Sequence, residues 1–146
     1  MEQLLIIDDE EHIRDLLSEM LGMSGYECTV AVSAMEARRI LKEKRFELVL
    51  CDINMPGESG LDFIQDVVSD FPDTATVMIT ALDDPLIAEH ALKMGVYDYI
   101  TKPFEFNGVL ISVANALRRR ELEIENRIYQ KNLEKKVEER TAALQD

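Results

Sequence analysis

Short apolar runs alternate five times with amphipathic stretches along the first 117 residues of the chain. The runs are rich in Leu, Ile and Val and have few polar interruptions, which is typical of strands buried on both faces of a parallel sheet. We expect strands at residues 4–7, 28–32, 48–51, 75–79 and 96–100. The regular alternation of strand and helix predicts an α/β fold with helices on both faces of the sheet.

The stretches between these runs carry apolar residues three and four positions apart, as amphipathic helices do. Ser33 is a suitable N-cap for the second helix. Asp83 or Asp84 is expected to cap the fourth helix, with Pro85 in its first turn and Gly95 at its end. Five such units predict a flavodoxin-like, doubly wound, five-stranded parallel sheet with strand order 2-1-3-4-5.

The composition changes at Arg118, because residues 118–146 contain no Gly or Pro and carry eight basic and seven acidic side chains. This segment predicts a long C-terminal helix that continues the fifth helix. A seven-residue spacing suggests a coiled-coil seam at Leu110, Val113, Leu117, Ile124 and Ile128, with Leu133 and Val137 in a shifted register. We therefore divide the chain into a globular domain, 1–117, and a helical linker, 118–146, to an unknown output module. Two chains are expected to associate through the linker; a single solvated helix is the alternative.

Composition narrows the possible functions. The chain is 47% hydrophobic and 31% charged, which fits a globular protein, and its net charge of −13 argues against nonspecific binding to nucleic acid or to an anionic membrane surface. No apolar run approaches the length of about 20 residues that a membrane-spanning helix needs. Cys28 and Cys51 lie within expected strands and are interpreted as buried free thiols of a cytoplasmic protein.

Carboxylates follow two of the expected strands. Asp8 and Asp9 come directly after the first strand, and Asp52 comes after the third. Because the carboxyl ends of parallel strands share one edge of a sheet, these acids are expected to lie close together and to need a cation. Mg²⁺ prefers such oxygen ligands: Asp9 and Asp52 are candidates for direct binding, Asp8 for orienting a metal-bound water, and Asn54 for supplying its backbone carbonyl.

Two further strands end in groups that suit phosphoryl chemistry. Asp52 is a feasible nucleophile toward phosphorus and would form an acyl phosphate. Lys102 follows the fifth strand and can neutralise phosphoryl oxygens, while Thr80 ends the fourth strand and can donate its hydroxyl to them. Each residue alone has an ordinary structural explanation, such as a helix cap or a solvated charge. Their joint occurrence at strand ends of one polarity indicates a site.

These motifs resemble the receiver domain of two-component response regulators. The resemblance covers residues 3 to about 118 and rests on four segments in family order: Leu4–Glu10, Asp52–Gly57 followed by Gly60, Thr80–Ala81 and Tyr99–Phe104. The resemblance also implies a cis peptide bond between Lys102 and Pro103.

The resemblance implies a phosphorylation switch and not an enzyme that turns over a substrate. Asp52 would accept a phosphoryl group from the histidine of a sensor histidine kinase or of a histidine phosphotransfer protein, with Mg²⁺ bound by Asp8, Asp9 and Asp52. Thr80 and Tyr99 would reorient on phosphorylation. The surface formed by the fourth helix, fifth strand and fifth helix would then change and carry the signal to the C-terminal helix.

Other functions remain open at this point. A metal-dependent phosphatase with an Asp nucleophile would need a second acid, but Asn54 stands in that position. A flavin carrier would need a phosphate-binding loop after the first strand, where the acidic run 8–11 would repel phosphate. Residues 133–141 resemble helical linkers in histidine kinases and cyclic-dinucleotide phosphodiesterases, so the chain is alternatively a receiver fragment of such an enzyme. A purely structural dimer module is a further alternative for residues 118–146.

Overall fold

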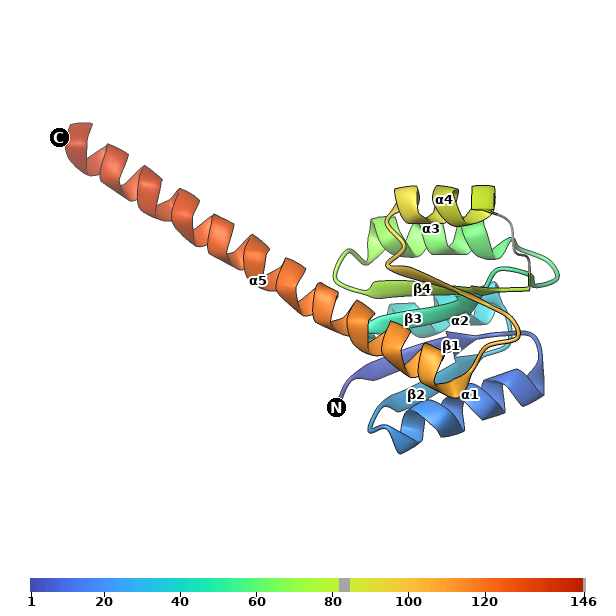
Figure 1. Cartoon of the computed structure of the whole chain (residues 1–146). Coiled ribbons are helices and arrows are strands. Elements are labelled where there is room, and N and C mark those ends of the chain that lie inside the picture. The colour runs from blue at the N-terminus through green and yellow to red at the C-terminus, as the bar shows by residue number, and fades with distance from the viewer. Residues whose placement is uncertain (82–84, 146) are drawn as a thin grey trace.

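Five parallel strands form the central sheet of the computed structural model, which describes residues 1–81 and 85–145. The strands are β1 (Gln3–Ile7), β2 (Glu27–Ala31), β3 (Leu48–Asp52), β4 (Ala75–Thr80) and β5 (Asp98–Thr101). Their order is β2-β1-β3-β4-β5, which confirms the predicted topology (Figure 1). The strands lie within two residues of their expected positions.

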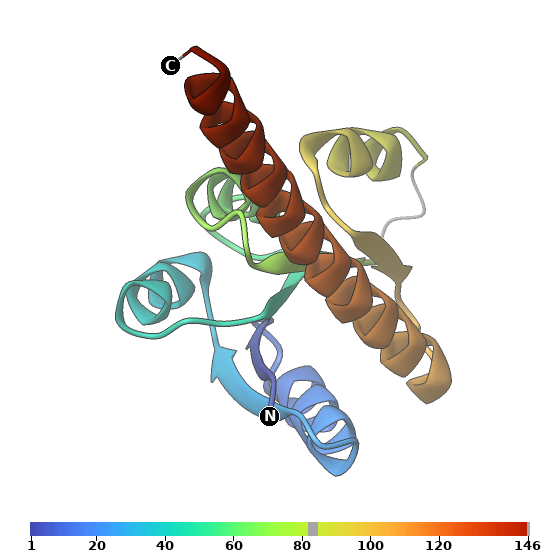
Figure 2. The same cartoon turned by 90° about the vertical axis from the view of Figure 1, so that its left-hand side faces the viewer.

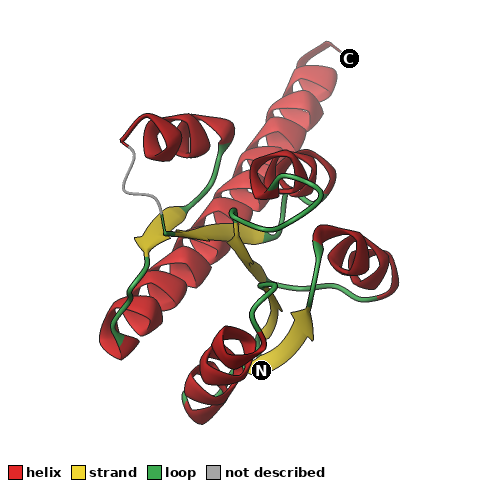
Figure 3. Ribbon diagram, turned by 90° about the vertical axis from the view of Figure 1, so that its right-hand side faces the viewer, coloured by secondary structure: helices red, strands yellow, loops and turns green. Residues whose placement is uncertain are grey.

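Helices cover both faces of the sheet, as the alternating pattern predicts. They are α1 (Glu11–Met23), α2 (Ala34–Glu43), α3 (Gly60–Asp70), α4 (Pro85–Met94) and α5 (Phe106–Gln145). One apolar cluster joins the sheet to α1 and α5, and a second joins it to α2, α3 and α4. Figure 3 shows the strands between these two helical layers.

Local signals place several helix ends where the sequence predicts them. The Ser33 hydroxyl accepts a hydrogen bond from the Glu36 backbone N–H, so Ser33 is the N-cap of α2. Gly95 follows α4 with φ of 111°, a conformation that favours glycine. The expected cap of α4 at Asp83 or Asp84 lies outside the described residues.

Helix α5 is 40 residues long and continues well past the sheet, which confirms the expected C-terminal helix (Figures 1 and 2). Its first part packs on the sheet, where Val113 and Leu117 are buried. These two residues belong to the seam that was predicted to join two chains. In the structure they pack within one chain instead. Within residues 1–81 and 85–145, no helix combines the length and the apolar character needed to cross a bilayer.

Candidate phosphorylation site

The register of the sheet brings Asp8 and Asp52 together. Ile7 of β1 pairs with Cys51 of β3, so the residues that follow them, Asp8 and Asp52, are neighbours at the carboxyl edge. Their side chains are only 1% and 2% exposed, respectively. Two neighbouring carboxylates that are both buried require a positive partner.

Each carboxylate divides its two oxygens between its own loop and a shared cation. Oδ1 of Asp8 accepts a hydrogen bond from the Glu10 N–H at 2.9 Å, and Oδ1 of Asp52 accepts one from the Asn54 N–H at 2.9 Å. The Lys102 ammonium donates to both Oδ2 atoms, at 3.1 Å for Asp8 and 3.0 Å for Asp52. The two turns therefore orient the carboxylates toward one positive charge.

The end of β5 positions Lys102. Its backbone N–H donates to the Thr80 carbonyl at 2.7 Å, and the peptide bond to Pro103 is cis, as expected from the sequence. Burial by itself lowers the pKa of the Lys102 ammonium, but the hydrogen bonds and charges of Asp52 and Asp8 outweigh this effect and raise the pKa above its usual value. Lys102 is therefore a permanent cation in the site.

Thr80 and Asn54 complete the rim of the site. The Thr80 side chain is fully buried at the end of β4, and its Oγ1 accepts a hydrogen bond from Asn54 Nδ2 at 3.0 Å. Tyr99 lies on β5, and its half-buried side chain packs on the apolar cluster that joins the sheet to α2, α3 and α4. Thr80 thus follows Ile79, the partner of Asp52 in the sheet, whereas Tyr99 packs on the cluster that includes residues of α4.

The donor set of the site fits a hard divalent cation. Carboxylate oxygens of Asp8, Asp9 and Glu10 lie within 4.8 Å of one another, and Asp52 shares the Lys102 ammonium with Asp8. Asp9 and Glu10 are exposed, so the cluster is open to solvent. Clustered carboxylate oxygens with space for water are the environment that Mg²⁺ prefers.

Three residues contribute to the site without having been predicted to. Glu10 adds a third carboxylate to the cluster of Asp8 and Asp9, and Arg14 Nη1 donates to the Asp8 carbonyl at 2.8 Å. Gly60 begins α3 directly against the Asp52 loop: a Cβ there would lie 2.8 Å from the Asp52 carbonyl oxygen. The sequence gave a signal for Glu10 in the acidic run and for Gly60 in the motif after Asp52, but it gave none for Arg14, whose contact sequence spacing does not specify.

The cysteines take no part in this chemistry. Cys51 is buried beside the site, and burial, followed by the charges of Asp52 and Asp8, raises the pKa of its thiol, which keeps it protonated. Cys28 is only half-buried, a correction to the expectation that both thiols are buried. It lies on β2, an edge strand of the sheet.

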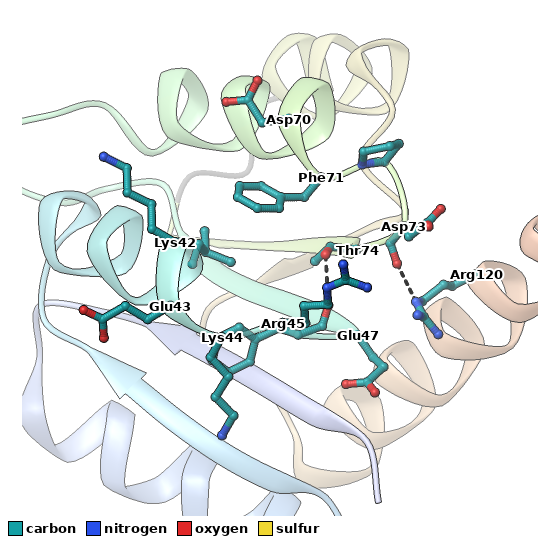
Figure 4. A pocket seen from close by; sticks show the side chains of 13 residues that line it. Lys42, Glu43, Lys44, Arg45, Glu47, Asp70, Phe71, Asp73, Thr74 and Arg120 are labelled. Atoms are coloured by element: carbon teal, nitrogen blue, oxygen red, sulfur yellow. Dashed lines mark hydrogen bonds between the residues drawn. The ribbon is translucent and has the colours of Figure 1, made fainter.

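A cavity lies at the opposite edge of the sheet. Its volume is about 730 Å³, and Phe46, Glu47, Asp73 and Thr74, which precede β3 and β4, form part of its wall (Figure 4). Arg120 from α5 also lines it and donates to the Asp73 carbonyl. Basic and acidic side chains are mixed around this cavity, so it offers no clear preference for a charged ligand. The cavity lies where α5 leaves the sheet, whereas the candidate site lies at the carboxyl ends of the strands.

The fold is that of a doubly wound α/β protein, with a cluster of carboxylates and one lysine at the carboxyl edge of its sheet. The profile of the response regulator receiver domain matches residues 4–114. The chain therefore belongs to the response regulator receiver domain family, in which phosphorylation-dependent signalling is the expected activity.

Curated relatives agree with this assignment. The chain is 40% identical over 124 residues to the response regulator protein PilR of Pseudomonas aeruginosa, a match that covers 85% of this chain and 28% of PilR. It is 37% identical over 116 residues to protein PetR of Rhodobacter capsulatus, covering 80% of this chain and 48% of PetR. The chain thus spans less than half the length of these two relatives.

Solved structures show the same architecture. A receiver domain protein from Clostridium thermocellum superposes with a TM-score of 0.78 at 31% identity, covering 84% of this chain and 98% of that one. NtrX from Brucella abortus gives a TM-score of 0.84 at 30% identity, covering 89% of this chain and 30% of NtrX. The response regulator TrrA of Thermotoga maritima, solved in complex with Mg²⁺ and BeF, gives a TM-score of 0.73 at 30% identity, covering 80% of this chain and 99% of TrrA.

Proposed function

We propose that this chain is a signalling switch in which Asp52 accepts a phosphoryl group from a histidine of a sensor histidine kinase or a histidine phosphotransfer protein. The observation that carries the proposal is the convergence of Asp8 and Asp52 on the Lys102 ammonium at the carboxyl edge of the sheet. In such a site the carboxylate nucleophile lies beside a positively charged group, the Lys102 ammonium, which can offset the negative charge of an incoming phosphoryl group.

In the proposed transfer, a carboxylate oxygen of Asp52 forms a bond to phosphorus while the bond between phosphorus and the histidine nitrogen of the donor breaks. The released histidine nitrogen takes up a proton, and Asp52 carries an acyl phosphate. Lys102 stays charged and can neutralise a phosphoryl oxygen, because its ammonium already lies 3.0 Å from the Asp52 carboxylate. Thr80 donates its hydroxyl to another phosphoryl oxygen in this proposal.

We assign the proposed Mg²⁺ to Asp8, Asp9, Asp52 and the backbone carbonyl of Asn54. When bound, the ion would offset the repulsion between the carboxylates and the phosphoryl oxygens. The exposed side of the acidic cluster, at Asp9, leaves room for the water ligands that Mg²⁺ usually keeps.

We further propose that Thr80 and Tyr99 respond to phosphorylation. The Thr80 hydroxyl accepts a hydrogen bond from Asn54 and can donate one to a phosphoryl oxygen, which would draw Thr80 toward Asp52. That shift of Thr80 alters the space available to Tyr99. The surface of α4, β5 and α5 then differs between the two states, and α5 carries that difference toward the C-terminus. The populations of the two states depend only on the difference in free energy between them. A change of a few kcal/mol on phosphorylation is therefore sufficient to shift the equilibrium.

The proposed assembly is a homodimer formed through residues 118–146, and the proposed compartment is the cytoplasm. A polar helix that extends from its domain into solvent is marginal by itself, and a second chain would stabilise it. The free thiols of Cys28 and Cys51 fit a reducing compartment. We propose no direct contact of this chain with nucleic acid or with a membrane.

The proposed phosphorylation is tested by incubating the chain with acetyl phosphate and Mg²⁺ and measuring its intact mass. We expect one phosphate adduct that depends on Mg²⁺ and is absent from Asp52→Asn. Asp62→Asn removes an exposed carboxylate from the first turn of α3 and is the matched control, which should keep the adduct. An adduct on Asp52→Asn, or steady release of phosphate from an ester with no adduct, would contradict the proposal, and the second result would favour a phosphatase.

A further inference from the structure

One face of the C-terminal part of α5 is already used within the chain. Leu117 is buried on the sheet and Ile124 is half-buried. Farther along, the hydroxyl of Tyr97 donates to Glu123 at 2.6 Å, and Arg127 pairs with Asp73. These contacts hold the helix against the rest of the domain as far as residue 127. The predicted seam at Leu117 and Ile124 is therefore covered by the domain and is not available to a second helix.

The opposite face of α5 carries a separate row of large apolar side chains. Leu122, Tyr129, Leu133 and Val137 are 55%, 63%, 44% and 62% exposed, respectively. Leu133 follows Ile124 by nine residues, which is two and a half turns of a helix with 3.6 residues per turn, so it points away from the domain. We call these four residues the outer stripe.

The outer stripe has the regularity of a helix–helix contact. Leu133 follows Leu122 by eleven residues, and the sequence places Leu144 after the same interval. An eleven-residue repeat keeps apolar residues on one side of a nearly straight helix, with a slight right-handed supercoil. A shallow groove lined by Leu133, Val137 and neighbouring side chains lies along this face.

We propose that the outer stripe is the surface on which a second copy of this chain packs its own α5. The proposal rests on the proposed homodimer and assigns the face that forms it. A second α5 carries the same eleven-residue repeat and therefore matches the stripe along its length. Charge favours the same occupant: residues 118–146 have eight basic and seven acidic side chains, whereas residues 1–117 have eight basic and twenty-two acidic ones. Two nearly neutral extensions approach each other at little electrostatic cost, while two acidic domains repel.

The test compares apolar residues on the two faces by sedimentation of the full chain over a range of concentrations. The double variant Leu133→Gln/Val137→Gln removes half of the outer stripe while keeping good helix formers. Ile128→Gln is the matched control, because Ile128 is 55% exposed but lies outside the stripe. We expect the parent and Ile128→Gln to dimerise and the double variant to dimerise roughly 100-fold more weakly, from the loss of two buried apolar side chains.

Two results would overturn the assignment. One is dissociation of Ile128→Gln with an intact double variant, which would place the contact on the other face. The other is a parent chain that stays monomeric at every concentration, which would leave the stripe to a different partner. The intact-mass assay reports on Asp52 independently. A dimer of the expected kind that takes up no phosphoryl group supports the outer stripe and contradicts the proposed switch, and a phosphorylated monomer does the reverse.

Discussion

The central feature at the scale of single residues is a shared cation. Asp8 and Asp52 are almost fully buried, and both contact Lys102, which is itself only 17% exposed. A buried pair of like charges is tolerated because the ammonium lies between them. The proposed divalent cation would neutralise the same two carboxylates as the lysine, so the effects of the two on stability should depend on each other.

Lys102→Gln tests this dependence. Without the ammonium, two buried carboxylates face each other, so we expect the free energy of unfolding in metal-free buffer to fall by roughly 3 kcal/mol. Millimolar Mg²⁺ should recover part of that loss and stabilise the variant more than it stabilises the parent. Urea unfolding with and without Mg²⁺ measures both effects. Lys93→Gln, which removes an exposed lysine paired with Glu89, should change little, and equal stabilisation of parent and Lys102→Gln would refute the coupling.

Gly60 supports the site by its lack of a side chain. A Cβ at this position would lie 2.4 Å from the Ile53 Cα and 2.8 Å from the Asp52 carbonyl oxygen, both of which belong to backbone that is already packed. We expect Gly60→Ala to lower the free energy of unfolding by roughly 1–3 kcal/mol and to slow phosphorylation of Asp52, because the loop that follows β3 must move.

Gly22→Ala is the control for this substitution. Gly22 lies within α1, and a Cβ there would meet no atom within 4 Å, so alanine should stabilise the chain by roughly 0.5–1 kcal/mol. Chemical unfolding and the rate of adduct formation give both quantities. If Gly60→Ala and Gly22→Ala behaved alike, the proposed close packing on the Asp52 loop would be wrong.

The sequence predicts the acids and the lysine of the site because strand ends of one polarity share an edge, and the structure brings Asp8, Asp52 and Lys102 together there. It does not predict how they are arranged. The expectation placed a metal ion between the acids, whereas the structure shows that Lys102 also bridges two of them. Which oxygens face which partner depends on the turns after β1 and β3, and these follow from backbone geometry that spacing does not determine.

At the scale of elements, α5 shows a limit of periodicity. Val113 and Leu117 have the spacing of a coiled-coil seam, yet they are buried on the sheet of their own chain. Apolar residues every three or four positions show that one face of a helix is covered, but the pattern is the same whether a sheet or a second helix covers it. Only the tertiary structure separates the inner face of α5 from the outer stripe.

The contact of α5 with Tyr97, the residue that precedes β5, should depend on pH. The hydrogen bond from Tyr97, opposed by burial and assisted by Arg119, holds the pKa of Glu123 below its ordinary value of 4.5. A lowered pKa in the folded state means that this contact stabilises the chain above about pH 4.5 and that the contribution is lost as the pH falls through the folded-state pKa. Tyr97→Phe should therefore be less stable than the parent at pH 7, and the difference should shrink in acid.

Urea unfolding of the parent and of Tyr97→Phe between pH 7 and pH 3 measures this difference. The phenyl ring keeps its place under the Arg119 guanidinium, which lies 4.3 Å from the ring centroid, so the substitution isolates the hydroxyl. Tyr26→Phe, made in a half-buried tyrosine at the start of β2, serves as the control. A deficit for Tyr97→Phe that stays constant across the acid range would show that Glu123 is not the titrating partner.

At the scale of the whole molecule, charge is divided between two parts. Residues 1–117 carry a net charge of −14, while residues 118–146 carry a net charge of +1. The overall topology was predictable because five alternations of strand and helix leave few ways to build a right-handed parallel sheet. The direction in which α5 leaves the sheet was not predictable from the sequence. It depends on contacts between residues far apart in the sequence, such as Arg127 with Asp73.

The distribution of charge also bears on nucleic acid. The one compact basic run, Arg118–Arg120, is partly committed within the chain: Arg119 contacts Glu123 and the Tyr97 ring, and Arg120 donates to the Asp73 carbonyl. Binding to DNA requires several positively charged side chains that are free to contact phosphates. The acidic domain beside this run repels the phosphates.

We therefore expect no binding of the full chain to a labelled random duplex in fluorescence anisotropy, even at low salt, where electrostatic attraction is strongest. Glu121→Lys/Glu125→Lys replaces two negative charges on the exposed helix by two positive ones and should introduce weak, salt-sensitive binding. Salt-sensitive binding by the parent itself would show that the arginine run is free to contact phosphates.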